Sequence, residues 1–270
     1  MTSISETFRE LGKRNEAALI AYLTVGDPKP ENTQGFVRAL IEGGADIVEL
    51  GVPFSDPIAD GPTIQNAVSR SLAGGAKPLD ALRVARAVTN EYENPIVLMT
   101  YYNPIFRVGL PKFLVLAKRS GVSGIIVPDL PVEESQEYRQ HCITRGIDTI
   151  FLASPSTTPD RAKKILSQTT GYLYLVSLYG VTGIRAAVSK SALKLISEYS
   201  RLASATIPLA AGFGISKPQH VRQIVKAGAD GAIVGSAFVK RIEQNRASPR
   251  KAAQRLKRLA HSMKNATKNA

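Results

Sequence analysis

The feature that most constrains the fold is a regular alternation of short apolar runs with amphipathic stretches along the chain. The eight apolar runs are Ala18–Val25, Asp46–Val52, Ile96–Tyr101, Gly124–Asp129, Thr149–Ala153, Tyr172–Leu178, Leu209–Phe213 and Ala232–Ser236. Near-continuous hydrophobicity of this kind is typical of parallel strands covered on both faces. The stretches between them with helical periodicity include Glu31–Gly43, Pro111–Gly121, Glu133–Gly146, Pro159–Thr169 and Pro218–Gly228. The alternation predicts an α/β fold with right-handed crossovers.

A weakly repeated sequence pattern indicates short connections from helix to strand. The segments "EGGADIVELG", "RSGVSGIIVP", "TRGIDTIFLA" and "KAGADGAIVG" each place a glycine at a helix end, then a short turn, then a strand. Eight such units in 270 residues predict a single (β/α)₈ TIM barrel over residues 1–270, with an extra N-terminal helix and a basic C-terminal helix. A doubly wound open sheet is the alternative, but no G-x-G-x-x-G follows the first strand.

Several classes of protein are disfavoured by composition. No stretch of 18 consecutive apolar residues indicates a membrane span, and the N-terminus has no apolar signal core, so we expect a cytoplasmic protein. The single Cys142 allows no intrachain disulfide. His141, His220 and His261 all fall in expected helices, which argues against a zinc site or a histidine base. We therefore expect no metal in this chain.

Positive charge is concentrated at the C-terminal end. The formal net charge is +13, and residues 240–270 hold ten Lys or Arg against one acid, Glu243. One interpretation is a docked final helix with a solvated basic face, since Ala252, Leu256, Leu259 and Met263 lie near one side. The alternative is an acidic partner or non-specific contact with nucleic acid. No motif indicates specific nucleic-acid recognition.

The carboxyl ends of the late strands indicate a phosphate site. Catalytic groups of such barrels follow the strands, and phosphate sites are frequently built from the loops after strands 7 and 8. Here Gly212 and Gly214 follow the seventh run, and Gly235 and Ser236 open a helix after the eighth. Backbone N–H groups at a helix start bind anions, and Gly183 can close over the same place. The alternative is that these glycines only make tight turns.

Two acids near the second strand predict proton chemistry. Glu49 shares one strand face with Ile47 and Gly51, so an inward direction would bury it in a dry pocket and raise its pKa. Asp60 follows in a proline-rich loop that we expect to be polar, where it stays ionised. Two carboxylates in contrasting environments suggest divided proton-handling roles. Asp46, at the opposite strand end, is expected to serve stability.

Other interpretations of these acids remain open. Glu49 could form a buried pair with a Lys or Arg, and Asp60 could cap a helix that starts near Thr63. No Lys lies in the strand runs, which disfavours an imine aldolase. The residues expected to line an apolar, aromatic pocket are Tyr22, Ile64, Met99, Tyr101, Ile126, Leu152, Tyr174 and Phe213. Such a pocket suits a flat aromatic group with a phosphate-bearing tail.

These residues, in this order, resemble the α subunit of tryptophan synthase over nearly the whole chain. The most specific segment is "ELGVPFSDPIADGPTIQ"; "YLTVGDP", "YYNPIF", "PDLPVEES", "YLVSLYGVTG", "GFGIS" and "GADGAIVGSA" match further family segments. The resemblance implies a lyase that cleaves indole-3-glycerol phosphate to indole and glyceraldehyde 3-phosphate without a cofactor in this chain. It implies that Glu49 is the general acid/base and that Asp60 accepts a hydrogen bond from the indole nitrogen.

The resemblance also assigns the remaining site residues. It places the phosphate on Gly183, Gly212, Phe213, Gly214, Gly235 and Ser236. Tyr174 and Thr182 match positions that line the site, with Thr182 tying a closing loop to Asp60. Two departures are Tyr22, where some relatives carry Phe, and Leu178-Tyr179, where many bacterial relatives have Arg and a small residue. Tyr22 keeps an aromatic wall but adds a hydroxyl that needs a partner.

The family further implies a β subunit, which carries pyridoxal phosphate, in an α2β2 complex. Pro53 and Asp56 lie in the loop expected to face that partner; their alternative role is rigid loop geometry. Rival enzymes are indole-3-glycerol phosphate synthase, which would need a strand lysine, and phosphoribosylanthranilate isomerase. The non-catalytic alternative is a phosphate-ligand-binding barrel that acts only as an allosteric activator of a partner subunit.

Overall fold

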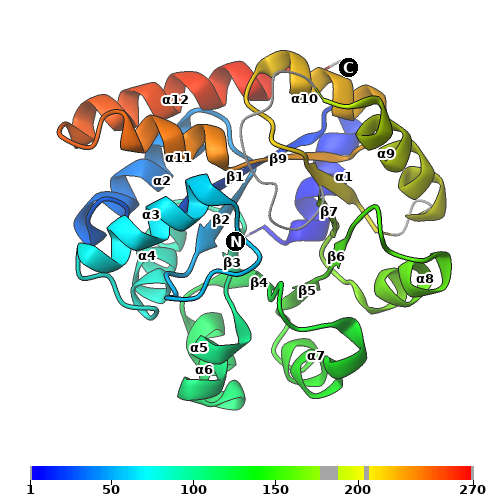
Figure 1. The fold of residues 1–270 in the computed structure, drawn as a ribbon, viewed down its shortest axis with the longest axis horizontal. Coiled ribbons are helices and arrows are strands. Elements are labelled where there is room, and N and C mark those ends of the chain that lie inside the picture. Colours follow the sequence, from blue (N-terminus) through cyan, green and yellow to red (C-terminus); the bar gives the residue numbers. More distant parts are fainter. Residues whose placement is uncertain (1, 177–187, 204–206, 269–270) are drawn as a thin grey trace.

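The computed structural model describes residues 2–176, 188–203 and 207–268, and its strands form one parallel barrel seen end-on in Figure 1. The strands are β1 (Ala18–Thr24), β2 (Ile47–Gly51), β3 (Ile96–Met99), β4 (Val122–Ile126), β5 (Asp148–Ile150), β6 (Leu152–Ala153), β7 (Leu173–Val176), β8 (Leu209–Gly212) and β9 (Gly231–Val234). Their order is β5-β4-β3-β2-β1-β9-β8-β7-β6. The (β/α)₈ prediction is confirmed.

The nine strand labels correspond to eight barrel positions because the fifth expected strand is interrupted at Phe151. Its first part, β5, pairs with β4, and its second part, β6, pairs with β7. Tyr174 N donates to Phe151 O at 3.0 Å across the interruption. The two halves of one strand therefore join the two ends of the strand order and close the barrel.

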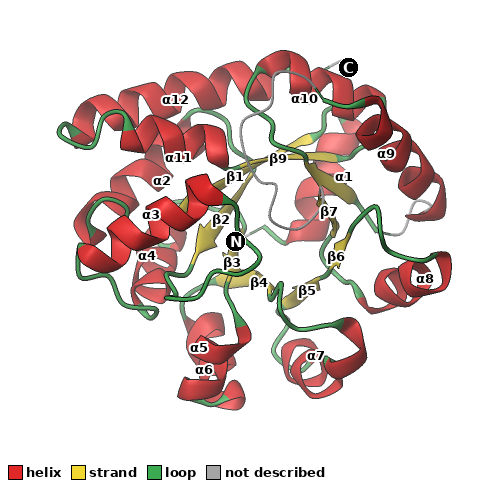
Figure 2. Cartoon of the chain, in the orientation of Figure 1, coloured by secondary structure: helices red, strands yellow, loops and turns green. Residues whose placement is uncertain are grey.

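Helices surround the strands, as the colouring of Figure 2 shows. They are α1 (Ile4–Lys13), α2 (Thr33–Glu42), α3 (Pro62–Ala73), α4 (Asp80–Thr89), α5 (Tyr102–Val108), α6 (Leu110–Arg119), α7 (Gln136–Ile143), α8 (Pro159–Gln168), α9 (Lys190–Ala203), α10 (Pro218–Lys226), α11 (Ser236–Glu243) and α12 (Pro249–Asn265), with short 3₁₀ turns at Pro30–Asn32 and Val132–Glu134. Helix α5 begins directly after the third apolar run, Ile96–Tyr101. Its Pro104 lies in the first helical turn, where a missing N–H is tolerated.

Alternation along each strand separates two apolar cores. In β2, Ile47 belongs to the barrel interior, whereas Val48 and Leu50 pack in the outer layer against the helices. Glu49 shares the inward face of Ile47, as the period of two requires. Because Tyr22 of β1 is the register partner of Glu49, both side chains point into the barrel at one level.

The two terminal helices have different tasks. Helix α1 contributes Ile4, Phe8 and Leu11 to the barrel-interior cluster, so it closes the N-terminal end of the barrel. Helix α12 buries Leu256 and Met263 in the outer layer and leaves most of its cations exposed. A docked final helix with a solvated basic face is thus what the structure shows. No helix in the described part of the chain is long and apolar enough to span a membrane.

Candidate active site

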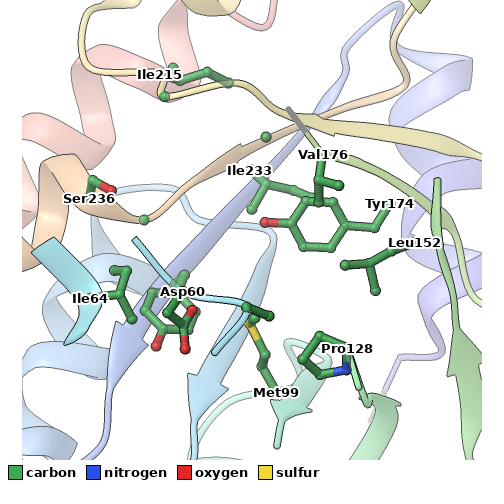
Figure 3. Close-up of a pocket in the computed structure, with 15 residues that line it drawn as sticks. Asp60, Ile64, Met99, Pro128, Leu152, Tyr174, Val176, Ile215, Ile233 and Ser236 are labelled. Carbon is green, nitrogen blue, oxygen red and sulfur yellow. The ribbon is translucent and has the colours of Figure 1, made fainter. Parts of the chain in front are cut away.

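A pocket opens at the carboxyl ends of the strands, where the sequence analysis placed the chemistry. It holds about 770 Å³ of space, part of it open to solvent. Figure 3 shows apolar side chains pointing into it from several strands, with Asp60 and Ser236 at its polar edges. Its lining is Tyr22, Ala59, Asp60, Ile64, Met99, Pro128, Leu152, Tyr174, Val176, Gly212, Gly214, Ile215, Ile233, Gly235 and Ser236. Mostly apolar walls with few polar groups suit an aromatic ligand with one charged end.

Glu49 is fully buried beside this pocket without a compensating cation. Its Oε1 accepts a hydrogen bond from Tyr172 Oη at 2.5 Å, while Oε2 has no hydrogen-bond partner among the described residues. Burial raises the pKa of Glu49 to about 7, against the lowering effect of the Tyr172 hydrogen bond. No cation pairs with it in the described ranges, so the alternative of a buried salt bridge finds no support. The carboxyl can therefore hold or release a proton near neutral pH.

Asp60 is also buried, which corrects the expectation of a polar loop. Its side chain is drawn inward by Tyr101, whose Oη donates to Asp60 Oδ2 at 2.9 Å and accepts from Ala59 N at 3.0 Å. Burial raises the pKa of Asp60 to about 6, and the Tyr101 hydrogen bond opposes that rise. Asp60 remains mostly ionised at pH 7. Helix α3 is capped by Gly61 without a side-chain bond, so Asp60 is not its cap.

Two buried tyrosines, Tyr22 and Tyr174, lie close enough to both acids to respond to their charges. After burial, the charges of both Glu49 and Asp60 raise the pKa of Tyr174 and of Tyr22, so these hydroxyls stay protonated. The Tyr22 hydroxyl finds the partner it needs in Thr24 Oγ1, 3.2 Å away. A methyl group at Gly51 would lie 2.2 Å from the Tyr22 hydroxyl. Because Gly51 has no side chain, it leaves room for the Tyr22 ring in the pocket.

The glycine-rich end of the pocket offers backbone to an anion. Gly214 has a φ of +67°, a left-handed conformation that favours glycine. Gly235 is the N-cap of α11, and Ser236 is its first residue, so unpaired N–H groups of a helix start lie at this edge. Gly212 has a second role, because a Cβ there would come within 2.8 Å of the Tyr174 ring. Backbone N–H groups and one hydroxyl thus form an anion-binding edge.

Three residues expected in the lining do not line the pocket. Phe213 lies between two inward glycines and therefore points into the outer core. Ile126 packs in the barrel-interior cluster with residues of α1. Tyr101 packs against Phe54, with ring centroids 5.4 Å apart, and reaches the site only through its bond to Asp60.

Four further predictions concern loops. Thr182 and Gly183 lie outside the described residues. Pro53 is buried in this chain, whereas Asp56 is exposed, so only Asp56 presents its side chain to solvent. A role for either at a subunit interface stays a prediction.

The sequence analysis missed several residues that alternation could have found. Tyr172 and Val176 each lie two positions from Tyr174, and Ile233 lies two before Gly235, so each shares its neighbour's inward face. Other lining residues it missed are Ala59, Pro128 and Ile215. In the described part of the chain, no cluster of His, Cys, Asp and Glu could hold a metal ion. Burial raises the pKa of the Cys142 thiol to about 12, which makes it inert.

Comparisons with known proteins agree with one another. A family model described as "Tryptophan synthase alpha chain" matches residues 8–268. The tryptophan synthase alpha chain of Methanosarcina barkeri is 48% identical over 268 residues, covering 99% of this chain and 98% of the relative. A structure of Mycobacterium tuberculosis tryptophan synthase superposes with a TM-score of 0.91 at 34% identity and covers both chains completely. A structure of the tryptophan synthase a2b2 complex of Pyrococcus furiosus gives a TM-score of 0.86 at 45% identity, covering 92% of this chain and 98% of the other.

Proposed function

This chain belongs to the tryptophan synthase alpha chain family, and from that premise we propose that Glu49 and Asp60 carry out its reaction. The chain is a lyase of tryptophan biosynthesis that cleaves indole-3-glycerol phosphate to indole and glyceraldehyde 3-phosphate. The observation that carries the site assignment is the Glu49 carboxyl, fully buried without a cation, with a pKa of about 7. Such a group is ready to give and take a proton at neutral pH.

Glu49 transfers protons at both ends of the bond that breaks. Its protonated carboxyl donates a proton to indole C3, which makes the ring an electron-poor indolenine. The carboxylate then takes the proton of the glycerol C3′ hydroxyl while the bond between C3 and C3′ breaks. The electron pair of that bond returns to the ring, so indole leaves with the added hydrogen and Glu49 regains its proton.

Asp60 stabilises the charge that develops on the ring. Its ionised carboxylate accepts a hydrogen bond from the indole N–H as C3 is protonated. Tyr101 holds Oδ2 at 2.9 Å and so fixes the direction of the carboxylate. A preoriented negative charge in a buried site stabilises a cation more strongly than water does. The pKa of Glu49 is about 7 and that of Asp60 is about 6. Between these values Glu49 is mostly protonated and Asp60 mostly ionised, so the two acids take different roles.

The phosphate binds at the glycine-rich edge. Gly212, Gly214 and Gly235 leave the backbone accessible, and Ser236 adds a hydroxyl at the start of α11. The indole lies among apolar side chains, which include Ile64. With both ends held, the reacting bond is kept beside Glu49.

The partner of the chain is a tryptophan synthase β subunit. We propose that pyridoxal phosphate belongs to that subunit and that the loop with exposed Asp56 faces it. No cofactor enters the proton transfers described above. We also propose a cytoplasmic location, in keeping with a biosynthetic family.

Indole release tests the proposed function. The purified chain is mixed with indole-3-glycerol phosphate, alone and with a β subunit, and indole is followed by chromatography. We expect indole under both conditions, faster in the complex because a covered mouth excludes water. Indole in neither condition would contradict the lyase. If the chain raises the rate of the β subunit but releases no indole itself, the alternative of a non-catalytic allosteric activator would hold instead.

A further inference from the structure

Three cations lie around a hollow on the outer side of the phosphate edge. Lys217 follows β8, while Lys240 and Arg241 lie in α11, and all three are exposed. Arg241 donates to Gln244 Oε1 at 3.2 Å. Within residues 2–176, 188–203 and 207–268, none of the three makes an ion pair, since Glu243 of α11 bonds an arginine of α3 instead. Their positive charge is therefore not neutralised locally.

This cluster lies next to the anion-binding edge. Ser216 and Ala237 line the hollow of the cations. Their chain neighbours, Ile215 and Ser236, line the substrate pocket. Lys240 lies four residues after Ser236 along α11, a rise of about 6 Å. The Debye length at physiological ionic strength is about 8 Å, so the field of the cations reaches the phosphate edge.

Acids occupy the opposite side of the mouth. Asp129 and Glu134 follow β4 and are exposed, whereas the cations follow β8 and β9. The strand order places β4 across the barrel from β9. In Figure 1, α10 and α11 accordingly lie at the edge of the barrel opposite α5 and α7. Arg161 lines a hollow with Asp129 but pairs with Glu133 at 3.2 Å, so Asp129 and Glu134 have no ion-pair partner in the described residues and face the three cations across the mouth.

We propose that Lys217, Lys240 and Arg241 form an electrostatic guide for the phosphate end of the substrate, an inference that rests on the proposed function. The substrate carries a phosphomonoester at one end and a neutral indole at the other. The cations attract the charged end toward Ser236, and the acids across the mouth repel it. The substrate therefore enters with its indole toward Asp60. Because the cations touch no reacting atom, they act on entry and binding and leave the chemical step unchanged.

A triple variant removes the guide. Lys217→Gln, Lys240→Gln and Arg241→Gln together should lower kcat/KM about three- to tenfold at low salt, from screened Coulomb attraction to a dianion. The value of kcat should stay the same, and the fall of kcat/KM with salt should become shallower. A triple variant with the same kcat/KM as the wild type at every ionic strength would overturn the guide.

A matched control removes the same charge from elsewhere. Arg14, Arg201 and Lys226 are exposed, lie at or next to the C-terminal ends of α1, α9 and α10, and make no ion pair in the described ranges. Replacing all three by Gln should leave kcat/KM within about twofold, because screening removes their effect at the mouth. An equal loss in both triple variants would show a net-charge effect and would overturn the guide.

Binding separates this inference from the proposed function. Glycerol 3-phosphate and indole are titrated by calorimetry into the wild type and both triple variants. Removing the guide should weaken glycerol 3-phosphate binding and leave indole binding unchanged; equal weakening of both would indicate a distorted pocket and overturn the inference. A wild type that releases no indole, but binds glycerol 3-phosphate through these cations, would contradict the lyase and leave the guide standing.

Discussion

Asp46 and Glu49 lie three residues apart at β2, and burial raises the pKa of both, yet only Asp46 has a cation to compensate its charge. Asp46, at the N-terminal end of the barrel, accepts hydrogen bonds from Leu19 N at 2.7 Å and from Lys264 Nζ at 3.0 Å. Lys264 also pairs with Glu16 at 2.9 Å. Glu49, inside the barrel, has a neutral phenol on one oxygen and no described partner on the other.

The difference separates a stabilising acid from a reactive one. The pKa of the half-buried Asp46 carboxyl is also raised by burial, but the Lys264 cation and the Leu19 N–H oppose that rise, and the ion pair ties α12 to the barrel. A buried carboxyl without a cation is destabilised when ionised, so its pKa rises into the range where proton transfer is useful. At its N-terminal end, β2 thus binds α12 through Asp46. Nearer its C-terminal end, it supplies Glu49 as the proton donor.

The largest effect should come from Glu49→Gln. Gln keeps the shape but cannot carry the proton, so kcat for indole release should fall about 10²- to 10⁴-fold, the usual loss for an acid/base group. Asp46→Asn should change kcat by less than about threefold, because it lies at the far end of the strand from the pocket. Both are measured by indole release in complex with the β subunit. Equal activity losses would erase the distinction between the two acids.

The variants Asp46→Asn and Glu49→Gln should change the free energy of unfolding in opposite directions. Asp46→Asn leaves Glu16 as the one ion-pair partner of Lys264 among the described residues and should lower the free energy of unfolding by about 2 kcal/mol, less than a fully buried pair because both side chains keep some exposure. The pKa of Glu49 is raised from 4.5 to about 7, so its favourable contribution is complete below 4.5 and is lost as pH rises through 7. Glu49→Gln should therefore raise the free energy of unfolding by about 3 kcal/mol at pH 8.5 and hardly at all at pH 4.5. Urea titrations at both pH values decide this; a pH-independent effect would refute it.

The smallest effect concerns the pH profile. The value of kcat/KM should rise as Asp60 ionises near pH 6 and fall as Glu49 loses its proton near pH 7. Tyr172→Phe removes a hydrogen bond that lowers the pKa of Glu49, so the falling limb should move upward by about half a unit to one unit. Tyr138→Phe is the control, since that buried hydroxyl bonds Ile125 O instead. A falling limb that stays in place, or moves downward, would remove Tyr172 from the account of Glu49.

Much of the candidate site followed from alternation and strand ends. The period of two placed Glu49 inside the barrel, and the glycine-rich strand ends placed Gly212, Gly214 and Gly235 at the pocket. Errors arose where a long-range contact decides direction. Tyr101, 41 residues from Asp60 in the chain, draws that acid out of solvent, and no local pattern contains this pairing.

By itself, the sequence determined the barrel, the inward face of each strand and the end at which chemistry occurs, because these depend on local periodicity and on strands sharing one direction. The tertiary structure alone decided how each acid is compensated. Lys264 reaches Asp46 from 218 positions away, and Tyr172 reaches Glu49 from 123 positions away. Charge stabilisation falls steeply with distance and depends on burial, so only the folded chain determines which carboxylate keeps its charge and which one can carry a proton.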